Sequence, residues 1–177
     1  MSITAAEAAL LGLLSEGAKH PYQIEKDVQF RDMRYWTELS MSAIYKLLSK
    51  LEFMNYVESK TEISEENRAR KVYQLTQDGE EAFREKIREL LSAAEHVRWE
   101  VDVAFYNFDM MDKTEQLGLL TSYRDKLTEQ IKGFHELEQF MHGEGCSIYP
   151  LSIVRRWIHI TEGEKQWIDE FVEKISK

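Results

Sequence analysis

Apolar residues in the N-terminal half recur every three or four positions in three stretches, which is the spacing of amphipathic helices. The stretches cover residues 4–17, 21–30 and 40–54. Each begins with a residue that favours the start of a helix: Thr4, which has the capping-box spacing with Glu7, then Pro21 and Ser40. The pattern therefore predicts three short helices before residue 55.

The period changes to two after Asn55. Alternate residues of positions 57–63 fall on one side of an extended chain, polar residues follow at positions 64–69, and a second extended stretch covers positions 70–76. This arrangement predicts a β-hairpin. Thr76 then provides a cap for another helical run, which the pattern extends to residue 108.

The C-terminal half carries longer apolar stripes with helical spacing. One runs from Leu117 to Met141 in a near-heptad rhythm, and another follows Pro150 and continues to Ile175. Such stripes need to be covered, and three arrangements are open: a hairpin of the two helices, a seam with a second copy of the chain, or a mixture of both. The residues expected at a dimer seam are Leu120, Leu127, Ile131, Phe134, Trp157, Trp167 and Phe171.

Composition agrees with a mainly α-helical fold, because the 177 residues include only 8 Gly and 2 Pro. The sharpest change of pattern lies near residue 80, so we expect one domain over residues 1–80 and a helical second domain over residues 81–177. The N-terminus lacks the features of a signal peptide, no apolar run is long enough to span a bilayer, and Cys146 has no second cysteine to pair with. We therefore expect a cytoplasmic protein that does not enter a membrane.

The net charge of −9 at pH 7 argues against a protein that coats nucleic acid indiscriminately. Both parts of the chain, divided at residue 80, are negative, so any contact with nucleic acid would have to come from small local clusters of cations. The third predicted helix has such a face. Ser42, Tyr45 and Lys46 lie opposite its leucines, and no acidic residue occurs between Leu39 and Leu51.

Three more cations lie at or just past the predicted hairpin tip: Arg68, Arg70 and Lys71. Three helices followed by a two-stranded hairpin is the order of a winged helix-turn-helix domain, in which the third helix enters the major groove and the hairpin contacts the flanking backbone. Cations at both places would attract phosphates, although Glu62 and its acidic neighbours weaken that field. The alternatives are a surface helix that merely lacks acids and a solvated run of charges.

The sequence resembles the PadR-like family of bacterial transcriptional regulators in three segments: "LLGLLSEGAKHPYQI", "SMSAIYKLLSKLE" and "RKVYQLTQDG". These segments cover roughly the first half of the chain, and the second half resembles the longer members in layout. The resemblance implies an N-terminal winged helix with a two-stranded β wing and a C-terminal long-helix dimerisation region. Met41, Ser42 and Lys46 depart from the residues that the family often shows there, so its base preferences are not transferred.

Carried onto this chain, the resemblance implies that residues of the second helix, the third helix and the wing approach DNA. They are Tyr22, Ser40, Ser42, Tyr45, Lys46, Lys50, Arg68, Arg70 and Lys71. Family members are mostly repressors, and some respond to phenolic or other aromatic compounds. We therefore expect a homodimeric repressor of detoxification, efflux or stress genes that binds a pseudo-palindromic operator on double-stranded DNA and is relieved by a small aromatic effector. The alternative is a winged-helix adaptor that binds proteins without sequence-specific DNA binding.

Other chemistry finds little support in the sequence. His135, His142 and Cys146 match no zinc spacing and lack a fourth ligand. No phosphate-binding glycine loop, His-Glu-x-x-His motif or nucleophile elbow is present, so we expect neither an enzyme nor a metal or cofactor. Aromatic residues of the second half could line an effector pocket, although aromatics at helical spacing more often form core: Trp99, Phe105, Tyr106, Phe108, Trp157 and Trp167.

Overall fold

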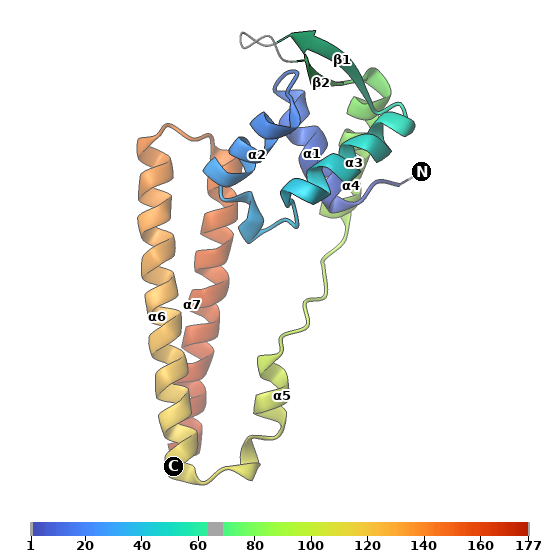
Figure 1. Ribbon diagram of the computed structural model, residues 1–177. Coiled ribbons are helices and arrows are strands. Elements are labelled where there is room, and N and C mark those ends of the chain that lie inside the picture. Colours follow the sequence, from blue (N-terminus) through green and yellow to red (C-terminus); the bar gives the residue numbers. More distant parts are fainter. Residues whose placement is uncertain (1, 64–68, 177) are drawn as a thin grey trace. The chain divides into compact units, whose positions relative to one another are not determined.

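The computed structural model describes residues 2–63 and 69–176 (Figure 1). The chain folds into two compact units, Met1–His96 and Val97–Lys177, which we call unit 1 and unit 2. The elements of unit 1 are α1 (Ala5–Ser15), α2 (Pro21–Phe30), η1 (Met33–Tyr35), α3 (Met41–Phe53), β1 (Val57–Ile63), β2 (Ala69–Leu75) and α4 (Gln77–Ser92). Those of unit 2 are α5 (Val101–Tyr106), η2 (Phe108–Met110), α6 (Lys113–Gly143) and α7 (Ile148–Ser176).

Side-chain caps begin the first three helices. Thr4 Oγ1 accepts a hydrogen bond from the Glu7 backbone N–H (3.2 Å), and the Glu7 carboxylate accepts one from the Thr4 N–H (2.7 Å), so the predicted capping box is confirmed. Ser40 Oγ caps α3 by accepting a backbone N–H at 3.2 Å. The cap of α2 was not predicted: His20 Nδ1 accepts the backbone N–H of Gln23 at 3.2 Å.

Unit 1 has an apolar core to which α1, α2, α3 and the base of the hairpin contribute. The predicted inner stripe of α3 lies in this core, with Ile44, Leu48 and Leu51 fully buried and Leu47 partly buried. Burial of one such side chain stabilises the fold by roughly 1.5–3 kcal/mol. The core therefore determines which face of α3 points inward, and the opposite face is left to solvent.

The predicted β-hairpin forms the wing. β1 and β2 pair antiparallel in the register Val57↔Leu75. The base of the wing is held by the buried side chains of Val57 and Tyr73 and by two backbone hydrogen bonds between Lys19 and Tyr73, 3.0 and 2.9 Å long. Because Lys19 stands just before α2, these bonds place the start of α2 beside β2.

α4 packs against α1 and belongs to unit 1. A Cβ at Gly79 would lie 1.9 Å from the Tyr56 carbonyl oxygen, so glycine is required where α4 approaches the start of the wing. The Phe83 ring covers Gly12, where a Cβ would come within 3.2 Å of it. The predicted domain boundary after residue 80 falls inside this helix, and the compact unit continues to His96 because α4 packs on α1.

The single helix predicted to continue to residue 108 is wrong. α4 ends at Ser92, Ala93 has extended backbone angles (φ −131°, ψ 136°), and a helix resumes only in α5. The apolar stripe of α4 loses its cover before that end, since Leu91 is 83 % exposed. Helices in proteins depend largely on burying one apolar face. The residues after Ser92 have helical periodicity but no surface on which to pack, so the helix does not continue through them.

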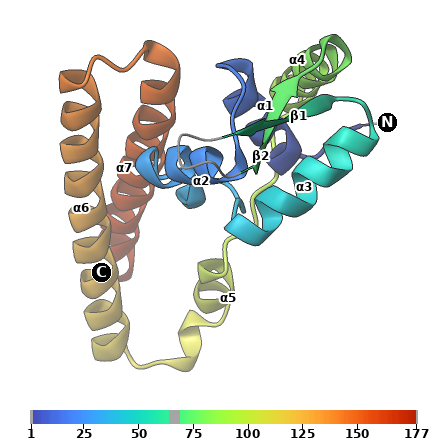
Figure 2. The same ribbon diagram turned by 45° about the horizontal axis from the view of Figure 1, so that its top comes forward.

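Unit 2 is built on an antiparallel hairpin of the long helices α6 and α7 (Figure 2). Leu120, Leu127 and Ile168 are buried in it, and aromatic side chains of α5 and η2 pack against this cluster. The chain reverses in the predicted turn, where Gly145 adopts a positive φ of 70°. Within the described residues, no helix combines the length and apolar character needed to cross a membrane.

The residues expected at a dimer seam are largely engaged within this hairpin. Leu120 and Leu127 are buried by their own chain, which corrects their expected role in contacting a partner. The ring centroids of Phe134 and Trp157 lie 5.5 Å apart, and Trp167 stacks on Phe171 with 5.4 Å between the ring centroids. Ile131 is partly buried. A short connection lets α6 and α7 pair without the entropy cost of joining two molecules. Each of the two helices therefore covers the apolar face of the other within one chain.

Candidate DNA interface

The face of α3 opposite the core carries hydroxyl, aromatic and cationic side chains. Tyr45 is 51 % exposed, and Lys46 next to it is also exposed. Within residues 2–63 and 69–176, no carboxylate forms an ion pair with Lys46. Its ammonium group is therefore available to an anion outside the protein, such as a phosphate.

The serine hydroxyls of this face also serve α3 itself. Ser40 caps the helix, its Oγ lies 3.1 Å from the Oγ of exposed Ser42, and Ser49 Oγ donates to the Tyr45 carbonyl at 3.1 Å. A hydroxyl has one donor hydrogen and two lone pairs, so each can form a further hydrogen bond. Loss of Ser40 would therefore affect the start of α3 as well as any contact with DNA.

A surface groove of about 860 Å³ lies beside Tyr45, between the start of α2 and β2. We call it the α2–wing groove. It is lined by His20, Pro21, Tyr22, Gln23, Lys26, Tyr45, Ala69, Arg70, Lys71 and Tyr73. Among residues 2–63 and 69–176, no acidic residue belongs to this lining. Three elements distant in sequence thus place aromatic and basic side chains around one hollow, which is the composition expected for contact with a phosphate backbone.

Positive charge dominates the α2–wing groove. Lys26 Nζ lies 5.0 Å from the centroid of the Tyr22 ring, a favourable cation–π contact. Burial, together with the positive charges of Arg70 and Lys26, holds the pKa of His20 below its ordinary value. His20 Nδ1 accepts the hydrogen bond that caps α2, which requires the nitrogen to be unprotonated. The imidazole therefore lies near two cations, Arg70 and Lys26, in a chain whose net charge is −9, and cations gathered at one place attract anions.

His20 and Lys26 were absent from the residues that the sequence suggested for DNA contact. His20 stands three residues before Gln23, which is the spacing of a capping pair, and Lys26 is one helical turn after Tyr22. These spacings could have drawn attention to both residues. Their place in a basic groove depends on β2, which the backbone bonds between Lys19 and Tyr73 bring alongside.

Lys50, expected near DNA, is engaged inside unit 1. Its Nζ lies 2.6 Å from Glu7 Oε1, and the Glu7 side chain is 1 % exposed. Burial raises the pKa of the Glu7 carboxyl, but the close ammonium of Lys50 and the hydrogen bonds with Thr4 outweigh burial and leave that pKa below its ordinary value. Lys50 therefore compensates a buried carboxylate, which would be costly to leave unpaired.

The wing cations have different surroundings. Lys71 Nζ lies 2.7 Å from Glu52 Oε2 and 5.0 Å from the centroid of the Tyr73 ring. Glu52 also accepts a hydrogen bond from Ser59, so this carboxylate joins the end of α3 to both strands of the wing. The charge of Lys71 is therefore shared with a carboxylate of the protein. Arg68 lies outside the described residues.

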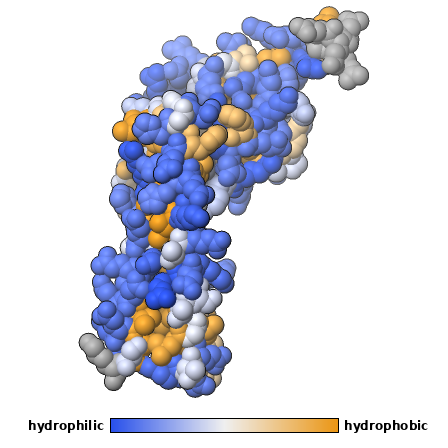
Figure 3. All heavy atoms as spheres, turned by 90° about the vertical axis from the view of Figure 1, so that its left-hand side faces the viewer, coloured by the Kyte–Doolittle hydropathy of each residue, from blue (hydrophilic) through white to orange (hydrophobic). Residues whose placement is uncertain are grey.

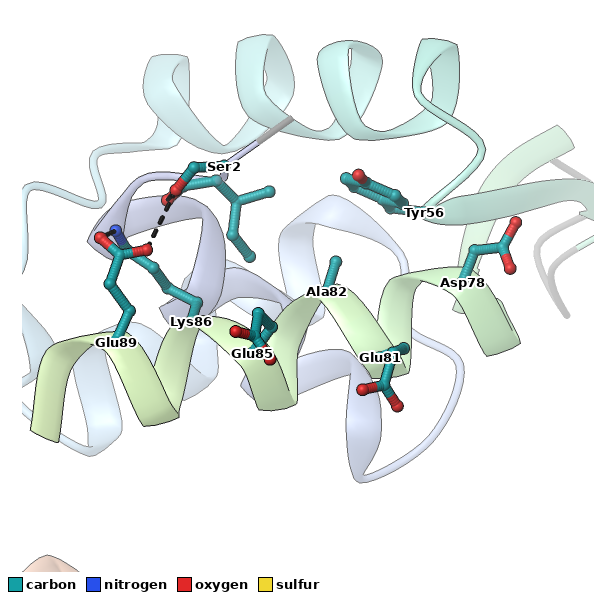
Figure 4. A pocket seen from close by; sticks show the side chains of 9 residues that line it. Ser2, Tyr56, Asp78, Glu81, Ala82, Glu85, Lys86 and Glu89 are labelled. Carbon is teal, nitrogen blue, oxygen red and sulfur yellow. Dashed lines mark hydrogen bonds and ion pairs between the residues drawn. The ribbon is translucent and has the colours of Figure 1, made fainter. Parts of the chain in front are cut away.

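Many of the acids of unit 1 lie on α4. Figure 4 shows a second hollow, of about 510 Å³, lined by Ser2, Tyr56, Asp78, Glu81, Ala82, Glu85, Lys86 and Glu89. The Ser2 hydroxyl and the Lys86 ammonium both donate to the Glu89 carboxylate, at 3.1 and 2.6 Å. None of these residues lines the α2–wing groove. This separation allows an acidic chain to present a locally basic surface.

The histidines and the cysteine considered for a metal have other surroundings. His135 lies 3.7 Å from Glu138 and 3.9 Å from Glu162, and Cys146 is partly buried. Across residues 2–63 and 69–176, no group of three or more His, Cys, Asp or Glu side chains is arranged to hold a metal ion.

The three helices followed by the two-stranded wing give unit 1 the element order of a winged helix-turn-helix fold. Residues 10–85 match the sequence profile described as "Transcriptional regulator PadR-like family". This part of the chain is therefore similar to the PadR-like family of transcriptional regulators. No curated protein sequence matches the chain.

Solved structures resemble the whole chain. The PadR protein of Bacillus subtilis in complex with operator DNA is 19 % identical, with 97 % of this chain and 99 % of that chain covered and a TM-score of 0.81. The same protein in complex with p-coumaric acid is 18 % identical, with 97 % and 95 % covered and a TM-score of 0.79. The Vibrio cholerae virulence activator AphA is 19 % identical, with 97 % and 98 % covered and a TM-score of 0.71.

These similarities establish the fold. The predicted class, mainly α with an N-terminal winged helix, a two-stranded wing and long C-terminal helices, is confirmed.

Proposed function

We propose that this chain is a sequence-specific transcription regulator that acts in the cytoplasm as a homodimeric repressor. The proposal rests on the convergence of Tyr45 from α3, Lys26 from α2 and Arg70 from β2 at one groove, whose lining contains no acid among the residues that the structure describes. Lys46, next to Tyr45, extends this basic surface along the exposed face of α3. In this scheme unit 1 binds DNA and unit 2 holds two copies of the chain together.

α3 enters the major groove, where Tyr45 and Lys46 meet base edges and phosphates. The α2–wing groove receives the neighbouring phosphate backbone, with Lys26 and Arg70 as cations and Tyr22 as a hydrogen-bond donor. Each cation that neutralises a phosphate contributes about −0.9 to the slope of log K against log salt. Three such cations in each of two protomers give a slope of about −5.

The homodimer places two α3 helices in successive major grooves of a pseudo-palindromic operator, about 34 Å apart. Because the inner stripes of α6 and α7 cover each other, the seam uses side chains on the outside of the hairpin. Large apolar residues exposed there are Leu119, Phe140, Ile148, Tyr149, Ile160 and Trp167. A second copy of the chain would remove them from water, which favours association.

The regulatory part of the proposal is supported by what the Bacillus subtilis protein binds, namely operator DNA and p-coumaric acid. We extend both to this chain: it represses detoxification, efflux or stress genes, and a small aromatic effector relieves repression. An effector can do so only if it binds the DNA-bound and released arrangements with different affinity. The Vibrio cholerae relative is described as an activator, so the sign of regulation has its own test.

Fluorescence anisotropy with the full chain and its own upstream DNA tests the DNA-binding part, with a scrambled duplex for comparison and a series of salt concentrations. The wild type should prefer the upstream DNA, with a slope near −5. Lys46→Ala and Arg70→Ala should each weaken binding and flatten the slope by about 2, because a dimer loses two cations. Lys132→Ala removes a 78 % exposed cation of α6 and serves as the matched control, with no change in slope.

Absence of any sequence preference, with and without candidate effectors, would contradict the regulator proposal and favour a winged-helix adaptor that binds proteins. Repression is tested separately by deleting the gene and measuring transcripts from the bound promoter. Transcript levels should rise on deletion. A fall would reverse the sign of regulation and leave the DNA-binding part of the proposal intact.

A further inference from the structure

One wing cation and one carboxylate near the end of α3 form an ion pair beside the α2–wing groove. The Lys71 ammonium lies 2.7 Å from Glu52 Oε2 and 5.0 Å from the centroid of the Tyr73 ring. Lys71 belongs to the lining of the groove, and Glu52 does not. Glu52 therefore acts on the charge of the groove without forming part of its wall.

The same carboxylate connects α3 to both strands of the wing. Glu52 belongs to α3, and it accepts hydrogen bonds from Ser59 on β1 and from Lys71 on β2. The base of the wing is packed in the core, but farther along the strands the residues at positions 60–63 and 69–71 are exposed. On the face that Figure 3 shows, unit 1 is largely hydrophilic toward the wing. Polar contacts such as those of Glu52 therefore hold the wing to α3 beyond its base.

Both members of this pair are charged at neutral pH. Hydrogen bonds from Lys71 and Ser59 hold the pKa of the Glu52 carboxyl below its ordinary value, and the hydrogen bond to Glu52 raises the pKa of the Lys71 ammonium above its own. The pair therefore brings no net charge to a phosphate. Moving Lys71 onto a phosphate would leave the Glu52 carboxylate unpaired near the DNA backbone, where like charges repel.

Lys26 lines the same groove but has different surroundings. Its Nζ lies 5.0 Å from the centroid of the Tyr22 ring, and an aromatic ring leaves the formal charge of the cation in place. Counterion release depends on the positive charge that a protein brings to the phosphates. Lys26 and Lys71 should therefore contribute unequally to the salt dependence of DNA binding, although both are lysines of one groove.

We propose that Glu52 determines the specificity of DNA binding by withholding the charge of Lys71 from phosphates and by fixing the wing relative to α3. This inference rests on the proposed function as a DNA-binding regulator. Phosphates are the same in every sequence, so a cation released toward the backbone strengthens non-specific binding. A specific complex also requires α3 and the wing to meet the DNA in one register, so a loosened wing lowers affinity for the operator alone.

Fluorescence anisotropy of the full chain with its upstream DNA and with the scrambled duplex, over a series of salt concentrations, tests this role. Glu52→Gln removes the charge and retains an acceptor for Ser59. The side chains of Lys71 and Glu52 are 49 % and 32 % exposed, so the pair adds little stability and the variant should fold, which urea unfolding checks. On the scrambled duplex its slope should be steeper by about 2, because a dimer gains two cations, and its affinity at about 0.1 M salt should rise about tenfold. Affinity for the upstream DNA should rise less, so the sequence preference should fall.

The double variant Glu52→Gln/Lys71→Met identifies the cation that is released. Its slope should return to the wild-type value, and Lys71→Met should flatten the slope by about 2 in the Glu52→Gln background and by much less in the wild type. Glu58→Gln is the matched control, because it removes the same charge from an exposed position of β1 whose side chain points to the face opposite Ser59. Its slope and sequence preference should equal those of the wild type.

The outcomes separate this inference from the proposed function. Equal slopes for wild type and Glu52→Gln, or a steeper slope that persists in the double variant, would refute the withholding of Lys71. A steeper slope with unchanged sequence preference, or the same changes in Glu58→Gln, would refute the role of Glu52 in specificity. The slope on the scrambled duplex requires no operator, so a wild type without sequence preference contradicts the proposed function while the slopes still test the state of Lys71. Binding of neither duplex at low salt would overturn both.

Discussion

Replacement of Lys50 by Met separates two roles for this lysine. The sequence placed Lys50 beside Lys46 on the DNA-facing side of α3, whereas the structure pairs its ammonium with Glu7 at 2.6 Å. Methionine keeps the unbranched apolar stem and removes the charge. Lys50→Met should therefore destabilise unit 1 and leave the electrostatic component of DNA binding unchanged.

The size of the effect follows from the burial of the two partners. Removing one member of a fully buried ion pair typically costs 3–5 kcal/mol, because the other charge is left buried and unpaired. The Glu7 side chain is 1 % exposed but the Lys50 side chain is 52 % exposed, so water can partly replace the ammonium. We therefore expect a loss of about 1–3 kcal/mol in the free energy of unfolding.

The pH dependence provides a second signature of the same pair. The pKa of Glu7 is lowered in the folded protein, from an ordinary value of 4.5. A lowered carboxyl pKa contributes stability that is present above the unfolded value and is lost as pH falls through the folded pKa. The stability difference between wild type and Lys50→Met should therefore be largest near neutral pH and shrink as the pH falls, because protonation of Glu7 removes the buried charge from the variant and the ion pair from the wild type.

Urea unfolding followed by circular dichroism measures the stability, and anisotropy titrations at several salt concentrations measure the DNA-binding slope. Lys46→Met is the matched variant, with stability within about 0.5 kcal/mol of wild type and a slope flatter by about 2. Unchanged stability together with a flatter slope for Lys50→Met would refute the reasoning and return Lys50 to the DNA surface. The double variant Glu7→Gln/Lys50→Met should recover part of the lost stability, because no buried charge remains.

Three further variants probe other contacts by the same unfolding assay. Gly79→Ala should cost roughly 3 kcal/mol or more, because the added Cβ would lie 1.9 Å from the Tyr56 oxygen; a loss below 1 kcal/mol would mean that α4 shifts easily. Ser40→Ala should cost about 1 kcal/mol as a lost helix cap, with Ser40→Asp restoring stability; if Asp fails to restore it, the hydroxyl has another role. Tyr123→Phe should cost about 1 kcal/mol by removing the hydrogen bond to Glu164. Burial and Glu164 raise the pKa of Tyr123 above that of an ordinary phenol, so Tyr123 should stay protonated while ordinary tyrosines ionise. The absorbance titration over that pH range should therefore be the same in Tyr123→Phe as in the wild type.

The cations of α3 illustrate how far sequence periodicity reaches. Lys46 and Lys50 are four residues apart, so a helical projection places them on nearly the same face and assigns them the same role. What distinguishes them is Glu7, which the core brings from α1 to Lys50 and not to Lys46. A contact between residues 43 positions apart leaves no trace in the local pattern of either segment.

The residues of the proposed DNA-contact surface also fall into two groups, those that the sequence suggested and those that only the structure revealed. Tyr22, Tyr45 and Arg70 were proposed from the sequence because each sits in a segment that resembles the PadR-like family, and the structure places all three in the α2–wing groove. His20 and Lys26 belong to the same groove but were not among the residues that the sequence suggested. Their contribution depends on two backbone bonds that join the start of α2 to the wing.

Helix caps, periods and turns were readable from the chain because each depends on residues within about four positions of one another. The capping box at Thr4, the inner stripe of α3 and the antiparallel hairpin of the wing are such features. The early end of α4, the pairing of α6 with α7 and the neutralisation of Lys50 are of another kind. Each depends on whether a partner from a distant element covers an apolar face or a charge, and burial of that sort exists only once the chain has folded.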